Sequence, residues 1–394
     1  MSTRDLSKRL HFDASHAKGK AARERRVPEL DSLRGLAALA IVIYHADPRI
    51  IPFGWAAVDL FFVLSGYLIT SIILRHGSTP GFLVNFYVRR GLRVWPIYFL
   101  LIGLLVALNP LLYTPCDWRA LGFVLTFTQG IQHYWSNHVT HFSDYFSHTW
   151  TLAIEEQFYL IWPALILLVG RGRVVALSLI CLAGTLLIRS RGLDVFLLGT
   201  RADGLALGGL LAAILARFTP EGRNRPGLVA LFGLVAVLAS IPLAMSGAFT
   251  NSNVWAVIAA RPVVSILAFN LLWFGVVGLV VCQTGRPMLG VLRLRPLTGL
   301  GVISYGVYLY HYPLITFINQ QAIIVQKLPG RPLWLDAAFL VACLGSAWLS
   351  WIFIERPILN LKDRFNYGGR TATPTTSGPH ARPIGTAAEA EIID

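Results

Sequence analysis

Residues 54–70 read GWAAVDLFFVLSGYLIT, and the apolar run continues as SIIL to residue 74. Asp59 is the only charged side chain in this stretch. A run of about 20 apolar residues is long enough to cross a hydrocarbon core about 30 Å thick. Backbone amides and carbonyls find no partners in lipid, so a crossing segment must pair its own backbone groups as an α-helix. The stretch therefore predicts a membrane-spanning helix.

Comparable apolar runs recur from about residue 31 to residue 356, and they predict an all-α, polytopic integral membrane protein. Of the 394 residues, 55% are apolar and only 14% are charged, whereas soluble globular proteins carry roughly 25% charged residues. We expect about ten transmembrane helices, near residues 31–47, 54–74, 94–113, 148–169, 173–189, 193–216, 226–245, 262–283, 298–320 and 333–354.

The formal net charge of +14 is explained by membrane topology. With ten spans, most Lys and Arg residues fall on one side of the bilayer, which the positive-inside rule makes the cytoplasmic side. Both termini are then cytoplasmic, and we expect a multi-pass protein of the bacterial inner (plasma) membrane. Residues 117–130 are apolar but short for a crossing, and an eleventh span there would nearly remove the charge asymmetry. Nucleic acid is not an expected partner, because no basic helix or aromatic–basic module is present.

We divide the chain into three parts. Residues 1–27 form a basic cytoplasmic segment that lacks the apolar region of a signal peptide. Residues 28–358 form the transmembrane domain, and residues 359–394, rich in Gly, Thr, Pro and Ala, are expected to be a disordered cytoplasmic tail. The four cysteines are scattered and indicate neither a disulfide framework nor a zinc site.

The first span, LDSLRGLAALAIVIYHADP at 30–48, contains both Arg34 and His45. Ionisable groups at membrane depth are costly and point to function. Eleven residues turn a helix through about 1100°, so the two side chains share one face and lie about 16 Å apart along the axis. Taken alone, a buried histidine is as often a satisfied core residue as a functional one.

Carboxylates on two other spans strengthen the functional interpretation of His45. Asp59 lies on the second span, and Glu155 lies on the fourth, HTWTLAIEEQFYLIWP, seven residues after His148. A carboxylate within reach of a histidine can fix its tautomer and raise its basicity, as a general base requires. We therefore predict His45, Asp59 and Glu155 as the catalytic residues.

A basic cluster marks the opposite end of the first span. The stretch FYVRRGLRVWP at 86–96 is expected level with Arg34. Arginine runs beside a span often only set topology, but Arg34 lies within an apolar span. Guanidinium groups bind phosphate bidentately, so a nucleotide-bearing donor such as coenzyme A would fit. The candidate donor-binding residues are Arg34, Arg89, Arg90 and Arg93.

Two aromatic segments are candidates for substrate contact. The ninth span, LGVISYGVYLYHYP, places Ser304, Tyr308 and His311 on one face, beside Tyr305. The outer loop QHYWSNHVTHFSDYFSHTW ends at Trp150, and its aromatic rings suit stacking on a sugar or an interfacial belt. Its histidines lack the spacing of a zinc helix, so no metal is expected.

Two further segments are interpreted as structural. In the sixth span, Arg201 and Asp203 lie beside Gly204 and Gly208, a pair of small residues that permits close helix packing. At the end of the tenth span, the sequence IERP at residues 354–357 places a glutamate and an arginine side by side as an interfacial pair.

These segments together resemble the membrane acyltransferase 3 family. The resemblance extends from about residue 28 to residue 358, nearly the whole membrane domain. Six motifs occur in the expected order, and such an order is improbable by chance. The motifs are RGLAALAIVIYH, GWAAVDLFFVLSGYLIT, FYVRRGLRVWPIY, HTWTLAIEEQFYLIWP, SYGVYLYHYP and IERP.

Membership of that family implies an O-acyltransferase that takes an acyl group, most commonly acetyl, from acyl-CoA in the cytoplasm. The positions that match the family's motifs are Arg34, His45, Asp59, Arg90, Arg93, Glu155, Tyr305 and His311. Arginines would hold the phosphates of coenzyme A, and His45 would deprotonate the acceptor hydroxyl. Trp150, Tyr305 and His311 are the expected substrate-binding residues. A direct transfer and a transient acyl-histidine both remain open.

The expected acceptor is an envelope or exported glycan, with a macrolide or other secondary metabolite as the alternative. The sequence shows no counterpart of the hydrolase-like domain that some members carry, so we expect this domain alone to deliver the acyl group. A proton-coupled transporter is the main rival class. It would require an internal repeat, and the Arg34–His45 pattern occurs once. A catalytically silent scaffold is the third alternative.

Overall fold

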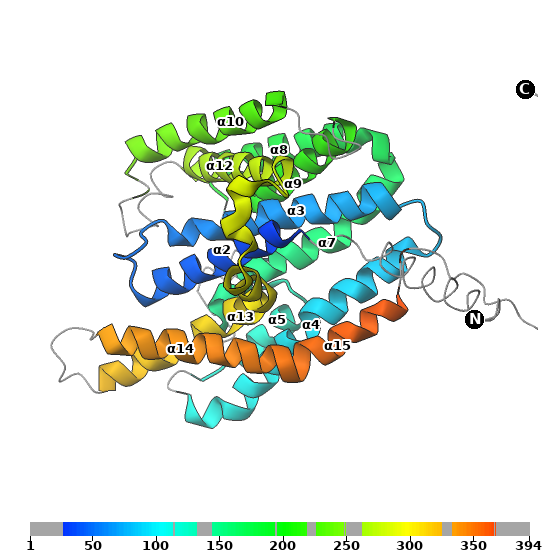
Figure 1. The fold of residues 1–394 in the computed structure, drawn as a ribbon. Helices are drawn as coiled ribbons and strands as arrows, with labels where there is room; N and C mark the ends of the chain where they lie inside the picture. The colour runs from blue at the N-terminus through cyan, green and yellow to red at the C-terminus, as the bar shows by residue number, and fades with distance from the viewer. Residues whose placement is uncertain are drawn as a thin grey trace, which may run out of the picture.

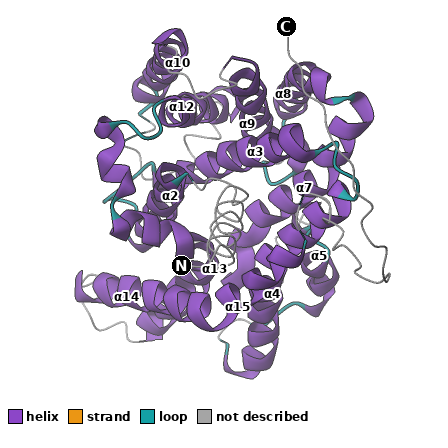
Figure 2. Cartoon of the chain, turned by 45° about the vertical axis from the view of Figure 1, so that its right-hand side comes forward, coloured by secondary structure: helices purple, strands orange, loops and turns teal. Residues whose placement is uncertain are grey.

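The fold is known from a computed structural model, which describes residues 27–112, 115–131, 144–193, 195–218, 226–247, 262–324 and 333–365 with Phe249 and Tyr367. Within these residues every regular element is a helix, as Figure 2 shows. Residues 1–26 of the basic segment expected over 1–27, residues 368–394 of the tail expected over 359–394, and the loop histidines between residues 132 and 143 lie outside the described residues.

In the described part of the chain ten long helices overlap the ten predicted spans, although α4 begins twelve residues before the span expected over 94–113. Their bounds are α2 (Pro28–Ala46), α3 (Ala57–His76), α4 (Phe82–Leu108), α7 (Trp150–Val169), α8 (Val174–Ser190), α9 (Leu198–Phe218), α10 (Pro226–Met245), α12 (Pro262–Cys282), α13 (Arg295–Ile324) and α14 (Leu333–Ser350).

Eight helices of the described chain are long and apolar enough to cross a membrane. This confirms the predicted all-α, polytopic architecture. The two of the ten that fall outside this set are α2 and α13. Helix α2 carries Glu29, Asp31 and Arg34, and α13 is rich in tyrosine. Both helices carry candidate site residues, which makes them more polar than the other spans.

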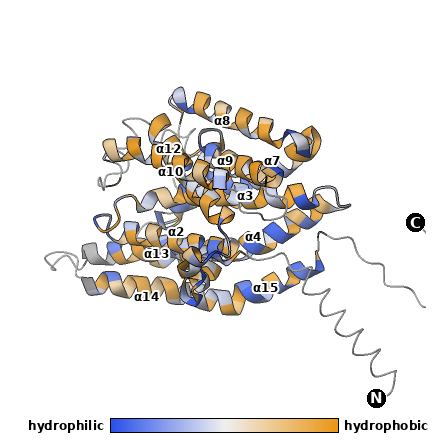
Figure 3. Ribbon diagram, turned by 45° about the horizontal axis from the view of Figure 1, so that its top comes forward, coloured by the Kyte–Doolittle hydropathy of each residue, from blue (hydrophilic) through white to orange (hydrophobic). Residues whose placement is uncertain are grey.

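Hydrophobic residues predominate along most helices of the bundle, as the colouring in Figure 3 shows. Large apolar side chains are widely exposed, among them Leu168 at 84%, Phe353 at 72% and Val341 at 71%. Soluble monomers rarely expose apolar surface on this scale. Lipid is therefore the solvent that this surface fits.

Two short segments test where the predicted spans begin and end: residues 117–130 and the residues that follow α14. Within residues 117–130 the helical residues are a 3₁₀ turn, α5 (Leu121–Leu125) and residues 129–130 of a separate short segment. Five residues of helix rise only about 7.5 Å, so this segment does not cross the bilayer. After α14, a π-helix, α15 (Arg356–Asn360) and a 3₁₀ turn continue to Arg364. The chain is thus helical past residue 359, where the tail was expected to begin.

The site is built on a core of α2, α3, α7 and α13, with α4 beside them (Figure 1). Helix α2 packs along α13, and α3 packs along α9. Helix α8 lies on α9, α10 pairs with α12, and α14 covers α13. Segments far apart in sequence, the first and ninth predicted spans, therefore lie side by side.

Glycines permit the two closest helix contacts. A Cβ on Gly35 of α2 would lie 2.7 Å from the backbone nitrogen of Gly301 on α13. A Cβ on Gly208 of α9 would lie 2.6 Å from the backbone nitrogen of Tyr67 on α3. Backbone cannot give way as a flexible side chain can, so both positions require glycine. The small-residue pair predicted in the sixth span thus lies at a helix contact.

We expect Gly35→Ala to lower the stability of the folded bundle by about 1–3 kcal/mol, because the added methyl group forces α2 and α13 apart. The measurement is thermal unfolding of the purified protein in detergent. Gly103→Ala on α4 is the matched control, since a Cβ there meets nothing within 4 Å. Equal unfolding temperatures for the two variants would contradict the close α2–α13 contact.

Candidate functional site

A cavity of about 650 Å³, which includes its opening to the surroundings, lies between α2, α3, α4, α7 and α13. Its lining combines an apolar wall with a cluster of charged and hydroxyl groups. The lining residues are Arg34, Val58, Phe61, Phe62, Ser65, Arg90, Arg93, Val94, Thr151, Leu152, Glu155, Tyr159, Ser304, Tyr305 and Tyr308.

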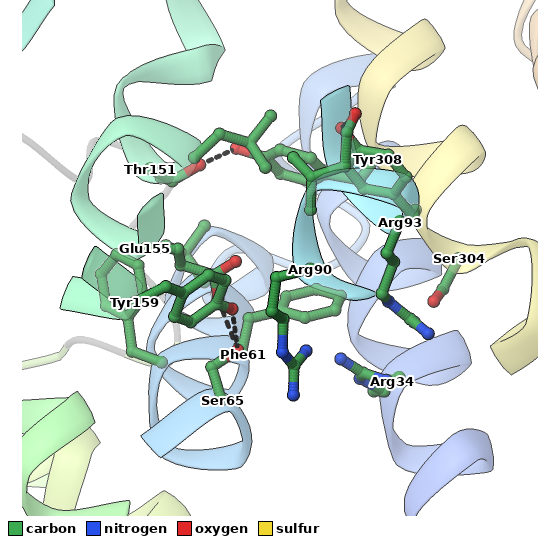
Figure 4. A pocket seen from close by; sticks show the side chains of 15 residues that line it. Arg34, Phe61, Ser65, Arg90, Arg93, Thr151, Glu155, Tyr159, Ser304 and Tyr308 are labelled. Carbon is green, nitrogen blue, oxygen red and sulfur yellow. Dashed lines mark hydrogen bonds between the residues drawn. The ribbon is translucent and has the colours of Figure 1, made fainter. Parts of the chain in front are cut away.

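Three of the four predicted donor-binding arginines line this cavity together: Arg34, Arg90 and Arg93. Figure 4 shows Arg34 and Arg93 near Ser304, facing the α7 wall across the pocket. In the described part of the chain none of the three makes an ion pair with a carboxylate within 4 Å. The buried Nε of Arg34 has no hydrogen-bond partner there. Three half-buried cations without carboxylate partners favour an anionic ligand.

The fourth arginine has a different position. Arg89 donates from Nη1 to the carbonyl oxygens of Lys362 and Phe365, each at 3.2 Å. Its guanidinium also lies 4.7 Å from the ring centroid of Tyr367. Arg89 therefore holds the segment after α15 and is not among the residues that line the cavity.

Glu155 is the one carboxylate among the residues that line the cavity. Ser65 donates a hydrogen bond of 2.7 Å to its Oε1, and the Tyr159 hydroxyl donates to Ser65 at 2.9 Å. Figure 4 shows this chain of three groups on the wall opposite Arg34. Glu155 is thus held in the same cavity as Arg34, Arg90 and Arg93, which we call the arginine pocket.

His45 lies at the other end of α2 from the arginines. Its Nδ1 is 2.9 Å from the carbonyl oxygen of Ile41, which can only accept a hydrogen bond. The proton therefore lies on Nδ1, and Nε2 is left as the basic nitrogen. The imidazole contacts two rings of α13, with centroids 5.0 Å from His311 and 5.2 Å from Tyr312.

His148 and His311 complete a cluster of three histidines with His45. His311 is fully buried, and its Nδ1 is 2.6 Å from the carbonyl oxygen of Tyr308. Its ring centroid is 5.2 Å from that of His148, which stacks on Tyr312 at 5.0 Å. We call His45, His148 and His311 the histidine cluster. The described contacts join His148 to this cluster instead of to Glu155.

Asp59 lies in a buried ionic core away from these histidines. Its carboxylate is 2.7 Å from Nη2 of Arg201, and Asp203 is 2.7 Å from Nη2 of Arg189. All four side chains are at most 4% exposed. Among the described contacts Asp59 has none with His45, the partner expected from sequence. The pairs instead tie α3, α8 and α9 together.

We expect Asp59→Ala to destabilise the protein by about 3–5 kcal/mol, because Arg201 is then a buried cation without its partner. Asp59→Ala combined with Arg201→Met should recover most of the folded yield, since it removes the orphaned charge. The readout is the fraction of monodisperse protein after gel filtration. Full yield of the single variant with lost turnover would instead support a catalytic Asp59.

The predicted substrate-binding aromatics are divided between two places. Tyr305 lines the cavity, and its hydroxyl donates to the carbonyl oxygen of Val94 at 2.8 Å. Trp150 lies under the guanidinium of Arg201, at 5.6 Å from the ring centroid, and packs on Phe196. Trp150 thus contacts the ionic core, whereas Tyr305 belongs to the cavity.

Several cavity residues were missed in the sequence. Thr151 and Tyr159 lie one turn to either side of Glu155 on α7, and Phe61 lies one turn before Ser65 on α3. Thr151 and Tyr159 could have been predicted, because each lies four residues from Glu155 and therefore on the same helix face. Glu355, interpreted as part of an interfacial pair, is instead only 6% exposed.

A family model described as "Acyltransferase domain" matches residues 27–354. The chain belongs to this acyltransferase family. The predicted resemblance is thereby confirmed, and the cavity and histidine cluster lie within the acyltransferase domain. No solved structure matches the chain.

Relatives of this acyltransferase domain carry acetyltransferase names. The peptidoglycan O-acetyltransferase OatA of Listeria monocytogenes is 28% identical over 84% of this chain and 56% of its own length. The putative peptidoglycan O-acetyltransferase YrhL of Bacillus subtilis is 30% identical over 86% and 56%. The O-acetyltransferase OatA of Staphylococcus aureus is 27% identical over 85% and 57%. The chain therefore spans just over half the length of these relatives.

Proposed function

We propose that the protein transfers an acetyl group from acetyl-CoA to a hydroxyl of an envelope or exported glycan. The observation that carries this proposal is the placement of Arg34, Arg90 and Arg93 in one cavity without carboxylate partners. Arginine forks suit the phosphates of coenzyme A. An uncharged acyl donor would leave these half-buried cations without an anionic partner.

The donor would extend from the arginine pocket toward the histidine cluster. Arg34 and His45 are separated by about 16 Å along α2, and Ser304 and His311 by about 10 Å along α13. The two helices pack against each other, so their polar faces define one path. A pantetheine arm along this path would bring the thioester near His45.

His45 then supplies the general base. Its Nε2 takes the proton of the acceptor hydroxyl as the oxygen attacks the thioester carbonyl, the C–S bond breaks, and the proton passes to the departing thiolate. This sequence needs no covalent enzyme intermediate. Tyr305 is assigned to the donor side, since it lines the cavity, and His311 to the reacting centre beside His45.

The acceptor proposal rests on the relatives. Two of them are named for peptidoglycan acetylation, so peptidoglycan is the first acceptor to test and other exported glycans follow. We place the arginine pocket at the cytoplasmic face of the inner membrane, where acetyl-CoA is present, because Lys and Arg concentrate on that side in the ten-span topology.

The test is transfer of label from radiolabelled acetyl-CoA in membranes with and without the expressed protein. Peptidoglycan, exported polysaccharide and a secondary-metabolite fraction are offered separately. We expect a base-labile label in a glycan fraction that depends on the protein. Label only in the secondary metabolite would overturn the proposed acceptor, and no protein-dependent label or coenzyme A release with any acyl-CoA would overturn the reaction class.

A further inference from the structure

The cavity and the histidine cluster are separated by one side chain. Tyr308 lines the cavity, whereas none of the three histidines does. The same ring lies 5.4 Å from the centroid of His148 and 5.5 Å from that of His311. On the cavity side, Phe61 packs against it at 6.1 Å. Tyr308 therefore contacts the cavity on one side and His148 and His311 of the histidine cluster on the other.

The Tyr308 hydroxyl is held in place by α7 and the turn before it. It donates to the carbonyl oxygen of His148 at 2.9 Å and is hydrogen-bonded to the hydroxyl of Thr151. Figure 4 shows this Thr151–Tyr308 pair at the end of the pocket away from Arg34. The two contacts satisfy the phenol as a donor and as an acceptor. They fix the ring across the path from cavity to cluster.

A donor held by the arginines meets this ring before its thioester can reach His45. The acyl carbon must lie within contact of both the acceptor oxygen and the base for reaction. In the arrangement described, the ring of Tyr308 occupies that path. Reaction therefore requires the ring to turn, and a turn breaks its contacts with Thr151 and His148.

We propose that Tyr308 is a gate between the donor pocket and the histidine cluster, and that the space its ring leaves on turning limits the length of the transferred acyl group. This proposal rests on the proposed acyl transfer and names the residue that controls donor access and acyl selectivity. The hydroxyl contacts with Thr151 and His148 hold the gate closed.

A closed gate also protects the thioester from water. Hydrolysis breaks the same C–S bond as transfer, with a water oxygen forming the new C–O bond and its proton passing to the coenzyme A thiolate. The products are free carboxylic acid and free thiol, so release of thiol without an acceptor measures the leak. Loss of the hydroxyl contacts should raise this leak, whereas loss of the ring should widen acyl selectivity.

The experiment compares Tyr308→Phe, Thr151→Val and Tyr308→Ala in membranes, with acetyl-CoA and butyryl-CoA as donors. Two rates are measured: label transferred to glycan and thiol released without acceptor. Tyr308→Phe and Thr151→Val should each raise the ratio of leak to transfer about fivefold, the effect of one lost hydrogen bond. Tyr308→Ala should lower the preference for acetyl over butyryl at least about tenfold, the effect of opening an apolar pocket.

Tyr310→Phe is the matched control, because its hydroxyl contacts Ser350 on α14, 2.9 Å away, and the residue does not line the cavity. It should keep both wild-type ratios. Unchanged leak in Tyr308→Phe and Thr151→Val would overturn the gate even if Tyr308→Ala failed to fold. Failure of the proposed function would look different, since wild type would then neither transfer label nor release thiol.

Discussion

Replacement of His45 by alanine is expected to reduce acyl transfer at least about 100-fold, the usual contribution of a positioned general base. The imidazole presents Nε2 because Nδ1 is bonded to the carbonyl of Ile41. No carboxylate contacts the ring among the described residues, so no carboxylate replaces it as base. The measurement is the initial rate of label transfer at saturating acetyl-CoA.

His76→Ala is the matched control for that experiment. His76 lies at the end of α3 and stacks on Tyr367, outside both the cavity and the histidine cluster. It should transfer acetyl at the wild-type rate. Near-normal turnover of His45→Ala, in protein that elutes as wild type on gel filtration, would remove His45 from the chemistry and point to another member of the cluster.

Replacement of Arg93 by alanine is expected to raise the KM for acetyl-CoA about 10- to 100-fold, the effect of losing a charge-assisted contact with phosphate. The KM for the acceptor should stay unchanged, because Arg93 lines the cavity proposed for the donor together with Arg34, which lies about 16 Å from His45 along α2. Donor and acceptor are therefore varied separately in the same membranes.

The control for Arg93 is Arg75→Ala, which removes an equal charge from the end of α3. Arg75 is exposed, bonds the carbonyl of Ser71 and does not line the cavity. Its donor KM should match that of wild type. An unchanged donor KM in Arg93→Ala would show that the arginine serves topology alone.

The fold was largely predictable because lipid imposes a simple rule on sequence. Each crossing helix must be long, apolar and internally hydrogen-bonded, so the apolar runs located all ten long helices. The positions of Arg34, Arg90 and Arg93 along their spans also predicted that the three side chains lie at one depth in the membrane, because each helical residue adds a fixed rise. Residues 117–130 failed the length criterion in sequence and do not cross in the structure.

Side-chain partners were less predictable, because depth does not specify rotation or neighbours. Asp59 was expected beside His45, but α3 turns this carboxylate toward Arg201 on α9. His148 was grouped with Glu155 through helical spacing, yet it contacts His311 and Tyr312 of α13. These contacts depend on which helices pack together, and that choice is set by close approaches such as Gly35 on Gly301.

The partners of Arg89 were also not predictable from its position in the sequence. The sequence groups it with Arg90 and Arg93, but successive helical residues lie about 100° apart. Arg90 and Arg93 are three residues apart and share the cavity, whereas Arg89 bonds the segment near Phe365. Arg89 also lies four residues before Arg93, a spacing that places two side chains on one helix face, so helical spacing alone does not separate these roles.

The most direct test of the proposed mechanism is a structure of the protein with coenzyme A bound. We predict phosphates in contact with Arg34, Arg90 and Arg93 and a thiol that points along α13 toward Tyr308. Binding studies on Arg93→Ala would accompany it, to show that the occupied site is the one that determines affinity. Coenzyme A bound elsewhere, with the arginine cavity empty, would contradict the assignment of this cavity as the donor site.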